Sequence, residues 1–399
     1  MVLITPFGVM SGYLSVTIVY LLTQAGVSVE ASGALVALSY IPHAWKFLWA
    51  PIADTTLTRK RWYVVAAIVS AVGIFATGAV PAESASLALL TVVVLASNVA
   101  VTFLAMAVES LMAYCAPDEA KGRAGGWFQA GNLGGYGLGG GAGLWLAQAL
   151  PQAWIGAAIL ALTCLLCCAA LAFVAEPPEQ IHTGRYGRTL VALGKDLWSV
   201  ARSRGGFLAL LICFLPIGSG AASNLWSAVA DDWHASANTV ALVTGVFSGI
   251  TSAAGCVVSG YWCDRMDRKR AYALFGVLLC VCASAMALGP RTETMYVVFT
   301  LAYGVINGFC YTAFSAVTLE AIGRGAAATK YSLFASLSNM PIGYMTAVDG
   351  WAAARWGSSG MLHTEALVGV IAVLFFAAVA SLSARYGRAA SPAVGRMPG

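Results

Sequence analysis

The segment WAPIAD (Trp49–Asp54), followed by the basic triplet RKR (Arg59–Arg61), decides the fold because the chain repeats its pattern. The second copy is GYWCDR (Gly260–Arg265), with another RKR triplet at Arg268–Arg270, and the aspartates at positions 54 and 264 lie 210 residues apart. Each copy ends a long apolar stretch and leads into a short basic one. The two segments therefore mark equivalent positions in two halves of one chain.

The composition places the apolar stretches around these segments in a membrane. Of 399 residues, 59% are hydrophobic and 10% are charged, whereas soluble chains carry roughly a quarter charged residues. A spanning helix needs ~20 apolar residues, and the apolar runs are continuous without the period-two alternation of an outer-membrane barrel. We therefore expect an integral membrane protein made of helices.

Apolar stretches predict twelve transmembrane helices. They cover residues 3–24, 31–53, 62–81, 85–115, 123–149, 153–175, 205–230, 236–262, 271–290, 294–322, 331–356 and 363–384. The longest connection, residues 176–204, is rich in charge, glycine and proline and falls in the middle. We expect an all-α membrane protein with two pseudo-symmetric six-helix bundles: an N-terminal bundle (1–175), a cytoplasmic linker, and a C-terminal bundle with a short tail (205–399).

The basic residues predict the orientation. Of the 22 Lys and Arg residues, 19 lie on alternate connections or in the C-terminal tail, which share one side of the membrane. By the positive-inside rule this side is cytoplasmic, so we expect both termini there. The first apolar stretch has no basic leader and no cleavage site, so we do not interpret it as a signal peptide. A multi-pass protein of a bacterial-type inner (plasma) membrane is the expectation.

Cysteine and glycine have packing explanations. Almost all of the ten cysteines lie inside apolar helices without His or carboxylate partners, which is typical of buried packing residues. Seven glycines between positions 134 and 143 predict close helix contacts. We expect neither a metal nor a cofactor.

Three further pairs of polar residues recur between the halves. They are Glu109 with Glu320, Arg123 with Lys330, and Asn132 with Asn339. Their offsets of 211, 207 and 207 residues nearly match that of the aspartates. A half with six helices keeps its orientation when repeated, so we expect parallel repeats related by an axis along the membrane normal.

These residues carry a family resemblance. The paired acidic-then-basic loops resemble the signature loop of the major facilitator superfamily, and the resemblance covers the whole chain. KFLWAPIAD (Lys46–Asp54) and ATKYSLFASLSN (Ala328–Asn339) are also similar to segments of the muropeptide permease and acetyl-CoA transporter group. That group usually has Asp at the position of Glu109 and Gln at that of Lys330. The resemblance implies a secondary transporter, not an enzyme, whose two halves rock about a central site.

Charges that recur in both halves are candidates for a shared cytoplasmic gate. They are Asp54, Arg59, Arg61, Glu109, Arg123, Asp264, Arg268, Arg270, Glu320 and Lys330. Glu109 has three interpretations: a gate residue, a proton carrier, or a carboxylate that reaches the membrane surface. It lies eight residues before Pro117, a rise of ~12 Å along a helix.

His43 and Lys46 lie deep in the second predicted helix and have no polar counterpart in the second half. They share one helix face, and a cation at this depth costs at least ~2.5 kcal/mol without a partner or a water-filled cavity. In one interpretation Lys46 attracts an anionic substrate and His43 titrates during coupling. In the other, Lys46 pairs with an acid such as Glu109 and His43 bonds a backbone carbonyl.

Other polar residues at mid-helix depth are candidates for lining a substrate cavity. They are Gln129, Asn132, Asn224, Trp226, Asn307, Tyr311 and Asn339. The alternative is that they join helices by hydrogen bonds. Asp349, near Trp351 and Arg355, is expected at the outer surface, as an interfacial anchor or part of an external gate pair.

The favoured function is proton-coupled import of an anionic, amphipathic solute such as an anhydromuropeptide. The alternatives are a siderophore or acyl-CoA-type anion transporter, a proton-antiport drug exporter, and a membrane sensor that does not transport. The repeated gate charges argue against the sensor. The expected partners are a small anionic solute, protons and the lipid bilayer, with no nucleic acid, and the expected oligomeric state is a monomer.

Overall fold

The structure, a computed structural model, describes residues 1–176, 186–323 and 327–389. Residues 177–185 of the predicted linker and most of the predicted tail lie outside the described residues. The described part of the chain forms helices and turns and contains no strand. The predicted all-helical membrane fold is confirmed.

Six spanning helices make the N-terminal half. The first combines η1 (Val2–Ile4), α1 (Thr5–Gly12), η2 (Tyr13–Ile18) and α2 (Val19–Gln24), and the second combines α3 (Val29–Ser39), α4 (Ile41–Trp45), η3 (Lys46–Leu48) and α5 (Ala50–Thr55). The others are α6 (Arg59–Ala79), η4 with α7 (Ser84–Ser86, Leu87–Cys115), η5, α8, η6 and α9 (Asp118–Ala120, Lys121–Gly137, Leu138–Ala142, Gly143–Ala149), and α10 with η7 (Ala153–Leu166, Cys167–Phe173).

The C-terminal half repeats this plan. The helices are α12 (Arg204–Phe214) continued by η8 (Ala221–Leu225), α13 (Trp226–Val229) and η9 (Ala230–Trp233); α14 (Ala237–Ala241), η10 (Leu242–Phe247) and α15 (Ser248–Arg265); α16 (Arg268–Leu288); α17 (Glu293–Ile322); and α18 (Ala327–Ala389). The label α18 joins two spanning helices at Gly357, whose positive φ of 67° breaks the regular backbone.

Eight segments of the described chain are long and apolar enough to cross a membrane, and the segment Ala327–Ser383 holds two helices. The remaining helices are the interrupted or glycine-rich ones: the second (α3–α5), the fifth (α8–α9) and the seventh (α12–η9). Their breaks or weak hydropathy hide them from a criterion based on length and composition. With them, the architecture agrees with the predicted twelve helices.

The repeated loops start new helices by the same device. Thr58 accepts a hydrogen bond from the Arg61 amide and caps α6, while Asp267 accepts one from the Arg270 amide and caps α16. Short polar side chains at this position satisfy amides that the helix leaves free. The basic triplets therefore occupy the first turn of equivalent helices in both halves.

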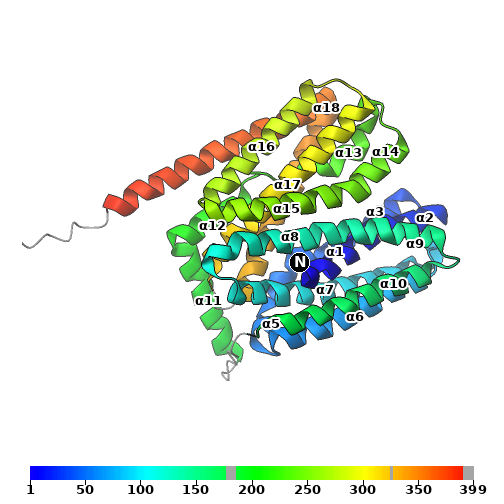
Figure 1. Ribbon diagram of the computed structural model, residues 1–399, viewed down its shortest axis with the longest axis horizontal. Helices are drawn as coiled ribbons and strands as arrows, with labels where there is room; N and C mark the ends of the chain where they lie inside the picture. Colours follow the sequence, from blue (N-terminus) through cyan, green and yellow to red (C-terminus); the bar gives the residue numbers. More distant parts are fainter. Residues whose placement is uncertain (177–185, 324–326, 390–399) are drawn as a thin grey trace, which may run out of the picture.

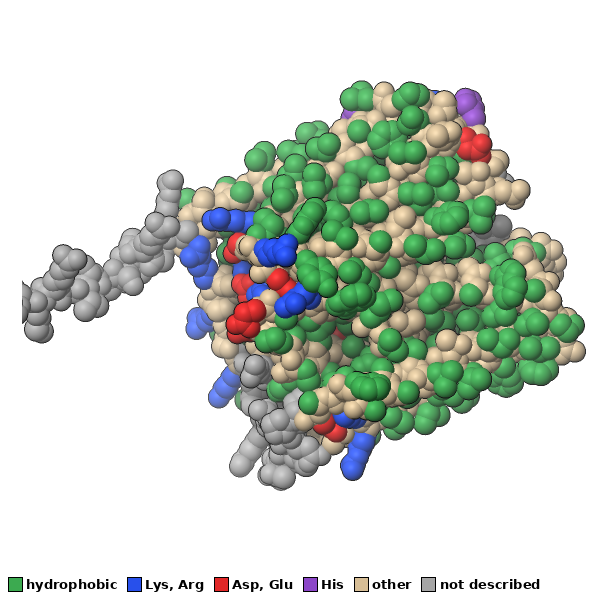
Figure 2. All heavy atoms as spheres, viewed as in Figure 1, with side chains coloured by type: hydrophobic (Ala, Val, Ile, Leu, Met, Phe, Trp, Pro, Cys, Tyr) green, Lys and Arg blue, Asp and Glu red, His purple; other side chains and the backbone are tan. Residues whose placement is uncertain are grey.

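The two halves pack side by side. Figure 1 shows α6, α7, α8 and α10 on one side and α15, α16 and α17 on the other, with α8 against α15 at the boundary. Most of the charged side chains visible in Figure 2 gather at one end of the helices, while the flanks are largely apolar. This end, where α6, α8 and α16 begin, is called the basic end below.

Glycines allow α1 and α8 to touch along their backbones. A Cβ added at Gly8 would lie 2.0 Å from the Asn132 carbonyl oxygen, and one at Gly12 would lie 1.9 Å from that of Tyr136. No side chain fits at such distances. The glycine-rich fifth helix therefore makes the close contacts that its sequence predicts.

The linker contains a helix that the sequence analysis did not predict. This helix, α11 (Tyr186–Arg202), lies at the basic end across the direction of the spanning helices (Figure 1). Val191 and Trp198 are exposed on it, and the Arg202 guanidinium lies 5.2 Å from the Trp198 ring centroid. Its apolar residues are spaced around an amphipathic helix and do not form a continuous run, so hydropathy alone misses it.

Candidate functional site

An ion pair lies in the interior of the N-terminal half. Lys46 Nζ is 2.6 Å from Glu109 Oε1, and the two residues are 5% and 2% exposed. Lys46 lies in η3, the turn between α4 and α5, and Glu109 lies on α7. Removing one partner would leave an uncompensated buried charge, which is strongly unfavourable. Of the two sequence interpretations of Lys46, the pairing with Glu109 is the arrangement present in this structure.

This position corrects one expectation for Glu109. The gate hypothesis placed its carboxylate among the charges at the basic end, but the side chain is buried and bonded to Lys46. Its second oxygen, Oε2, accepts a hydrogen bond from Ser332 Oγ of α18 at 3.4 Å. Glu109 thus contacts both halves of the molecule, because α7 belongs to one half and α18 to the other.

His43 bonds a side chain and not the backbone carbonyl considered from sequence. Its Nε2 lies 2.9 Å from Asn98 Oδ1, and Asn98 Nδ2 donates to the Val94 carbonyl. Since the amide oxygen only accepts, Nε2 carries the proton in this contact. The imidazole also packs edge-on against Phe7, with ring centroids 5.0 Å apart.

One face of α18 joins the two halves. Thr329, Ser332 and Ser336 are spaced by three and four residues, which places them on the same side of a helix. Thr329 Oγ1 donates to Asp54 Oδ2 at 2.7 Å, Ser332 to Glu109, and Ser336 Oγ to the His43 carbonyl at 3.4 Å. This face therefore connects the basic end with the buried ion pair and with His43.

A second polar connection crosses between α8 and α17. Gln129 Nε2 donates to Ser315 Oγ at 2.8 Å, and Asn132 Nδ2 donates to Gln129 Oε1 at 3.1 Å. Tyr331 Oη lies 2.9 Å from the same Ser315 hydroxyl. Two of the predicted cavity residues, Gln129 and Asn132, are thus joined in one network, which fits their alternative interpretation as links between helices.

The remaining predicted cavity residues are not gathered around Lys46. Asn224 is exposed and donates to Thr346 Oγ1 at 2.9 Å, whereas Trp226 packs inside the C-terminal half against Tyr303. Asn307 lies beside Gly220, where an added Cβ would come within 2.4 Å of its Oδ1. Tyr311 and Asn339 line a small pocket of about 50 Å³ between α12, α16, α17 and α18.

Tyrosines that the sequence analysis did not select lie between the halves. Tyr40 is 49% exposed, its ring lies 6.1 Å from that of His43, and it is within electrostatic range of Tyr136 on α8 and Tyr311 on α17. A half-exposed side chain this close to three helices indicates open space at the depth of His43. Uncharged tyrosines gave no signal in a search for membrane charges.

At the basic end, two aspartates cap helices of the opposite half. Asp54 accepts hydrogen bonds from the amides of Ala328 and Thr329, at 3.2 and 2.8 Å, at the start of α18. Asp264 accepts bonds from the amides of Gly122 and Arg123, at 2.6 and 3.2 Å, at the start of α8, and from Arg123 Nε at 2.8 Å. The repeated aspartates thus make equivalent contacts, each favoured by the positive end of a helix dipole.

The other gate candidates divide into three groups. Arg268 and Lys269 bind Glu320 at 3.1 and 2.6 Å within the C-terminal half, and Arg268 also donates across the boundary to the Asp118 carbonyl. Arg59 donates to Ser110 Oγ at 2.8 Å within the N-terminal half. Arg61 and Arg270 have exposed side chains, and Lys330 is buried near the start of α18.

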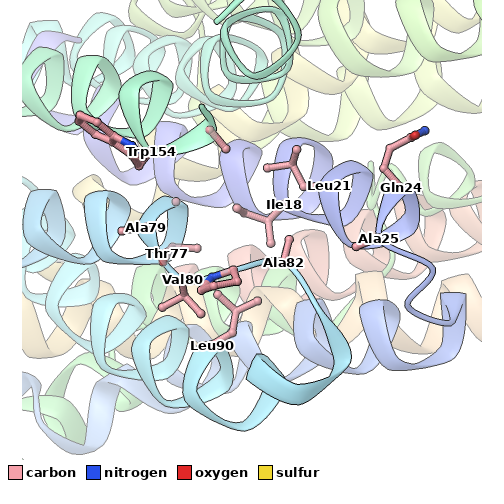
Figure 3. Close-up of a pocket in the computed structure, with 13 residues that line it drawn as sticks. Ile18, Leu21, Gln24, Ala25, Thr77, Ala79, Val80, Ala82, Leu90 and Trp154 are labelled. Atoms are coloured by element: carbon pink, nitrogen blue, oxygen red, sulfur yellow. The ribbon is translucent and has the colours of Figure 1, made fainter. Parts of the chain in front are cut away.

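A larger pocket lies away from all of these residues. It has a volume of about 380 Å³ and opens between α2, α10 and the connection from α6 to α7, far from the basic end (Figure 3). Its lining is mostly apolar, with Ile18, Leu21, Leu90 and Trp154. Among the described residues, no group of three or more His, Cys, Asp or Glu side chains is placed to hold a metal ion.

The family assignment follows from this fold and its repeated aspartates. The family model of the Major Facilitator Superfamily matches residues 1–344 and 208–395, so the chain belongs to this superfamily of transporters. It is a multi-pass membrane protein of that type. No curated protein matches the chain in sequence.

Several solved structures share the fold. The E. coli fucose:proton symporter FucP is 16% identical, with a TM-score of 0.71, and the match covers 95% of this chain and 97% of that one. The proton:xylose symporter XylE is 16% identical, with a TM-score of 0.68 and coverages of 95% and 94%. The human organic anion transporter MFSD10 (TETRAN) is 16% identical, with a TM-score of 0.69 and coverages of 94% and 98%. At these identities the likeness concerns the fold alone.

Proposed function

We propose that this protein is a proton-coupled importer of an anionic, amphipathic solute that works by alternating access. It lies as a monomer in a bacterial-type inner membrane with both termini in the cytoplasm. The excess of Lys and Arg at the basic end supports this orientation. The basic end then faces the cytoplasm, and the space around Tyr40 is reached from the opposite side.

The observation that carries the proposal is the Lys46–Glu109 ion pair. A cation held in the interior by one carboxylate is a site at which the carboxylate of a solute can take the place of Glu109. Protonation of Glu109 would remove its charge and leave Lys46 available to that anion. A proton and an anionic solute would then occupy the site together, which is the requirement for symport.

His43 is the second candidate for the proton. It lies one turn from Lys46 and beside the open space at Tyr40, and an unperturbed imidazole titrates close to neutral pH. The names of two fold neighbours, the fucose:proton and proton:xylose symporters, describe proton coupling in those proteins and agree with this proposal. A third neighbour is named as an organic anion transporter.

The aspartate caps supply the gate in this proposal. Asp54 and Asp264 each tie one half to the start of a helix in the other half, and both ties are formed here. They hold the basic end closed while the solute enters from the opposite side. For inward opening, both caps must break, and matched caps favour a symmetric rocking motion of the two halves.

The resemblance to muropeptide permeases makes an anhydromuropeptide the favoured solute. A ligand-stabilisation screen of the purified protein with anhydromuropeptides, CoA esters, iron-chelate siderophores and cationic drugs tests this choice. We expect the anhydromuropeptide to raise the melting temperature of wild type, and to have no effect on Lys46→Ala. Stabilisation by a cationic drug alone would contradict an anion importer, and stabilisation by a CoA ester or an iron chelate would assign a different anion.

A further inference from the structure

Two carboxylates are buried inside the C-terminal half without a cationic partner. Asp349 is 0% exposed and Glu365 is 6% exposed, and they interact with each other electrostatically. The sequence analysis expected Asp349 at the outer surface because aromatic residues and Arg355 follow it. The structure corrects this: the first part of α18 continues to Gly357, so Asp349 lies inside the bundle.

The surroundings of the pair are apolar. Trp226, Leu279, Met361, Leu362 and Ala366 belong to the packed cluster around it. Among the described residues, neither carboxylate forms an ion pair with Lys or Arg. Arg291, on the connection before α17, instead donates to Ser358 Oγ at 3.1 Å and lies 3.9 Å from the Trp233 ring centroid.

The hydrogen bonds of the two carboxylates are unequal. Glu365 Oε1 accepts a bond from Tyr303 Oη at 2.5 Å and one from the Ala222 amide at 3.4 Å. Among the described residues, neither oxygen of Asp349 has a hydrogen-bond partner, and neither does Glu365 Oε2. The other titratable groups around the pair are the thiols of Cys280, Cys282 and Cys310, which are weak donors.

Two facing carboxylates in an apolar interior cannot both be ionised at low cost, so the pair retains a proton. The donors Tyr303 and Ala222 stabilise an ionised Glu365, and the unpartnered Asp349 is then the protonated member. A second proton from the surrounding water would neutralise Glu365 and weaken its bond to the Ala222 amide. The unpartnered oxygens of Asp349 are the places where a bound proton is otherwise unexplained.

The Ala222 amide belongs to the interrupted seventh helix. Between α12 and η8 the chain is not helical over residues 215–220, and Gly218 and Gly220 have positive φ angles of 60° and 69°. Discontinuous helices are common at the coupling sites of transporters. A change of charge on Glu365 therefore acts directly on the segment of this half that has the least regular backbone.

We propose that Asp349 and Glu365 form a proton-binding site in the C-terminal half, whose occupancy is linked through Ala222 to movement of the interrupted seventh helix. The link to transport rests on the proposed proton-coupled function, but proton binding itself does not. This site is separate from Glu109 and His43, which lie in the other half.

Infrared difference spectroscopy of the full chain in lipid nanodiscs, between acidic and alkaline buffer, tests the site without any solute. We expect wild type to show the C=O band of a protonated carboxyl group that titrates with pH. The double variant Asp349→Asn/Glu365→Gln should lose at least half of this band, while Glu293→Gln, which changes an exposed carboxylate of α17, should keep it. If a correctly folded double variant keeps the full band, the proposal is wrong.

Tyr303→Phe provides a second test that a purely structural role would not affect. It removes a donor to ionised Glu365, so the midpoint of the band should move to higher pH while the band remains. It also serves if the double variant does not fold, and an unchanged midpoint would overturn the proposal. A band that responds to added Na⁺ at constant pH would likewise contradict a proton site.

The outcome is distinguishable from failure of the proposed function. A band that depends on Asp349 and Glu365 in a protein that imports no anion would sustain the site and reject the importer. Proton-driven uptake that persists in the double variant, with an unchanged infrared band, would reject the site and sustain the importer.

Discussion

Lys46 Nζ and Glu109 Oε1 lie 2.6 Å apart in the interior of the N-terminal half, and Ser332 of the C-terminal half bonds the other oxygen of the same carboxylate. The carboxylate thus senses both the charge of its own half and the position of the opposite half. An anion or a proton that reaches it would change the attraction between the halves as well as the local charge. Binding and movement can be coupled at this point.

The ion pair should show strong non-additivity in stability. Lys46→Met or Glu109→Gln alone leaves one polar partner without its counterpart, and breaking a buried pair costs about 3–5 kcal/mol. The double variant Lys46→Met/Glu109→Gln leaves no charge and should be more stable than Lys46→Met. Thermal unfolding of the three purified variants measures this, and additive losses would show that the two side chains do not interact.

His43 should influence the pH profile of uptake more than the fold. His43→Gln keeps a donor for Asn98 but cannot titrate, so we expect normal insertion and a flatter dependence of uptake on pH. His43→Ala should also lose the positioning bond and reduce uptake. Normal uptake and a normal pH profile in both variants would remove His43 from the coupling mechanism.

The aspartate caps should control opening of the basic end. Asp54→Ala removes the acceptor for the Ala328 and Thr329 amides, and loss of a cap costs about 1 kcal/mol. We expect hydrogen exchange at these amides to accelerate roughly fivefold, whereas Asp54→Asn, which keeps an acceptor, should change it less. Equal exchange in wild type and Asp54→Ala would show that the cap does not hold this end closed.

The contact between α1 and α8 should not tolerate a side chain. Gly12→Leu would drive atoms into the Tyr136 carbonyl, and overpacking of this kind costs about 1–3 kcal/mol or more. The matched control is Gly33→Leu on α3, because an added Cβ there meets nothing within 4 Å. Melting temperatures of the two variants give the comparison, and an equal effect would mean that the close helix contact is not required.

The sequence was sufficient for the fold and for the gate aspartates because both are repeated. Asp54 and Asp264 stand at one offset in the chain and make one kind of contact in space, so duplication identified them without a structure. Lys46 was identified by depth, and its pairing with Glu109 was one of two alternatives. Pairing between helices is set by packing, which a single sequence does not record.

Other features had no equivalent signal. Tyr40 is uncharged, and its exposure depends on how the second helix is interrupted at residues 40–50. Asp349 was misplaced because Trp351, Arg355 and Trp356 resemble an interfacial belt, while the break that ends its helix comes later, at Gly357. Trp226 was selected for its polar ring nitrogen but packs in the core against Tyr303.

Uptake into proteoliposomes with an imposed proton gradient tests the central claim most directly. With acid outside, we expect a labelled anhydromuropeptide to accumulate above its external concentration, to leak out when a protonophore is added, and to be excluded by vesicles that carry Lys46→Ala. In Glu109→Gln, accumulation should cease while exchange of labelled for unlabelled solute continues. If anhydromuropeptides, CoA esters and iron chelates all fail to accumulate in wild-type vesicles, with or without the gradient, the protein is not a proton-coupled anion importer.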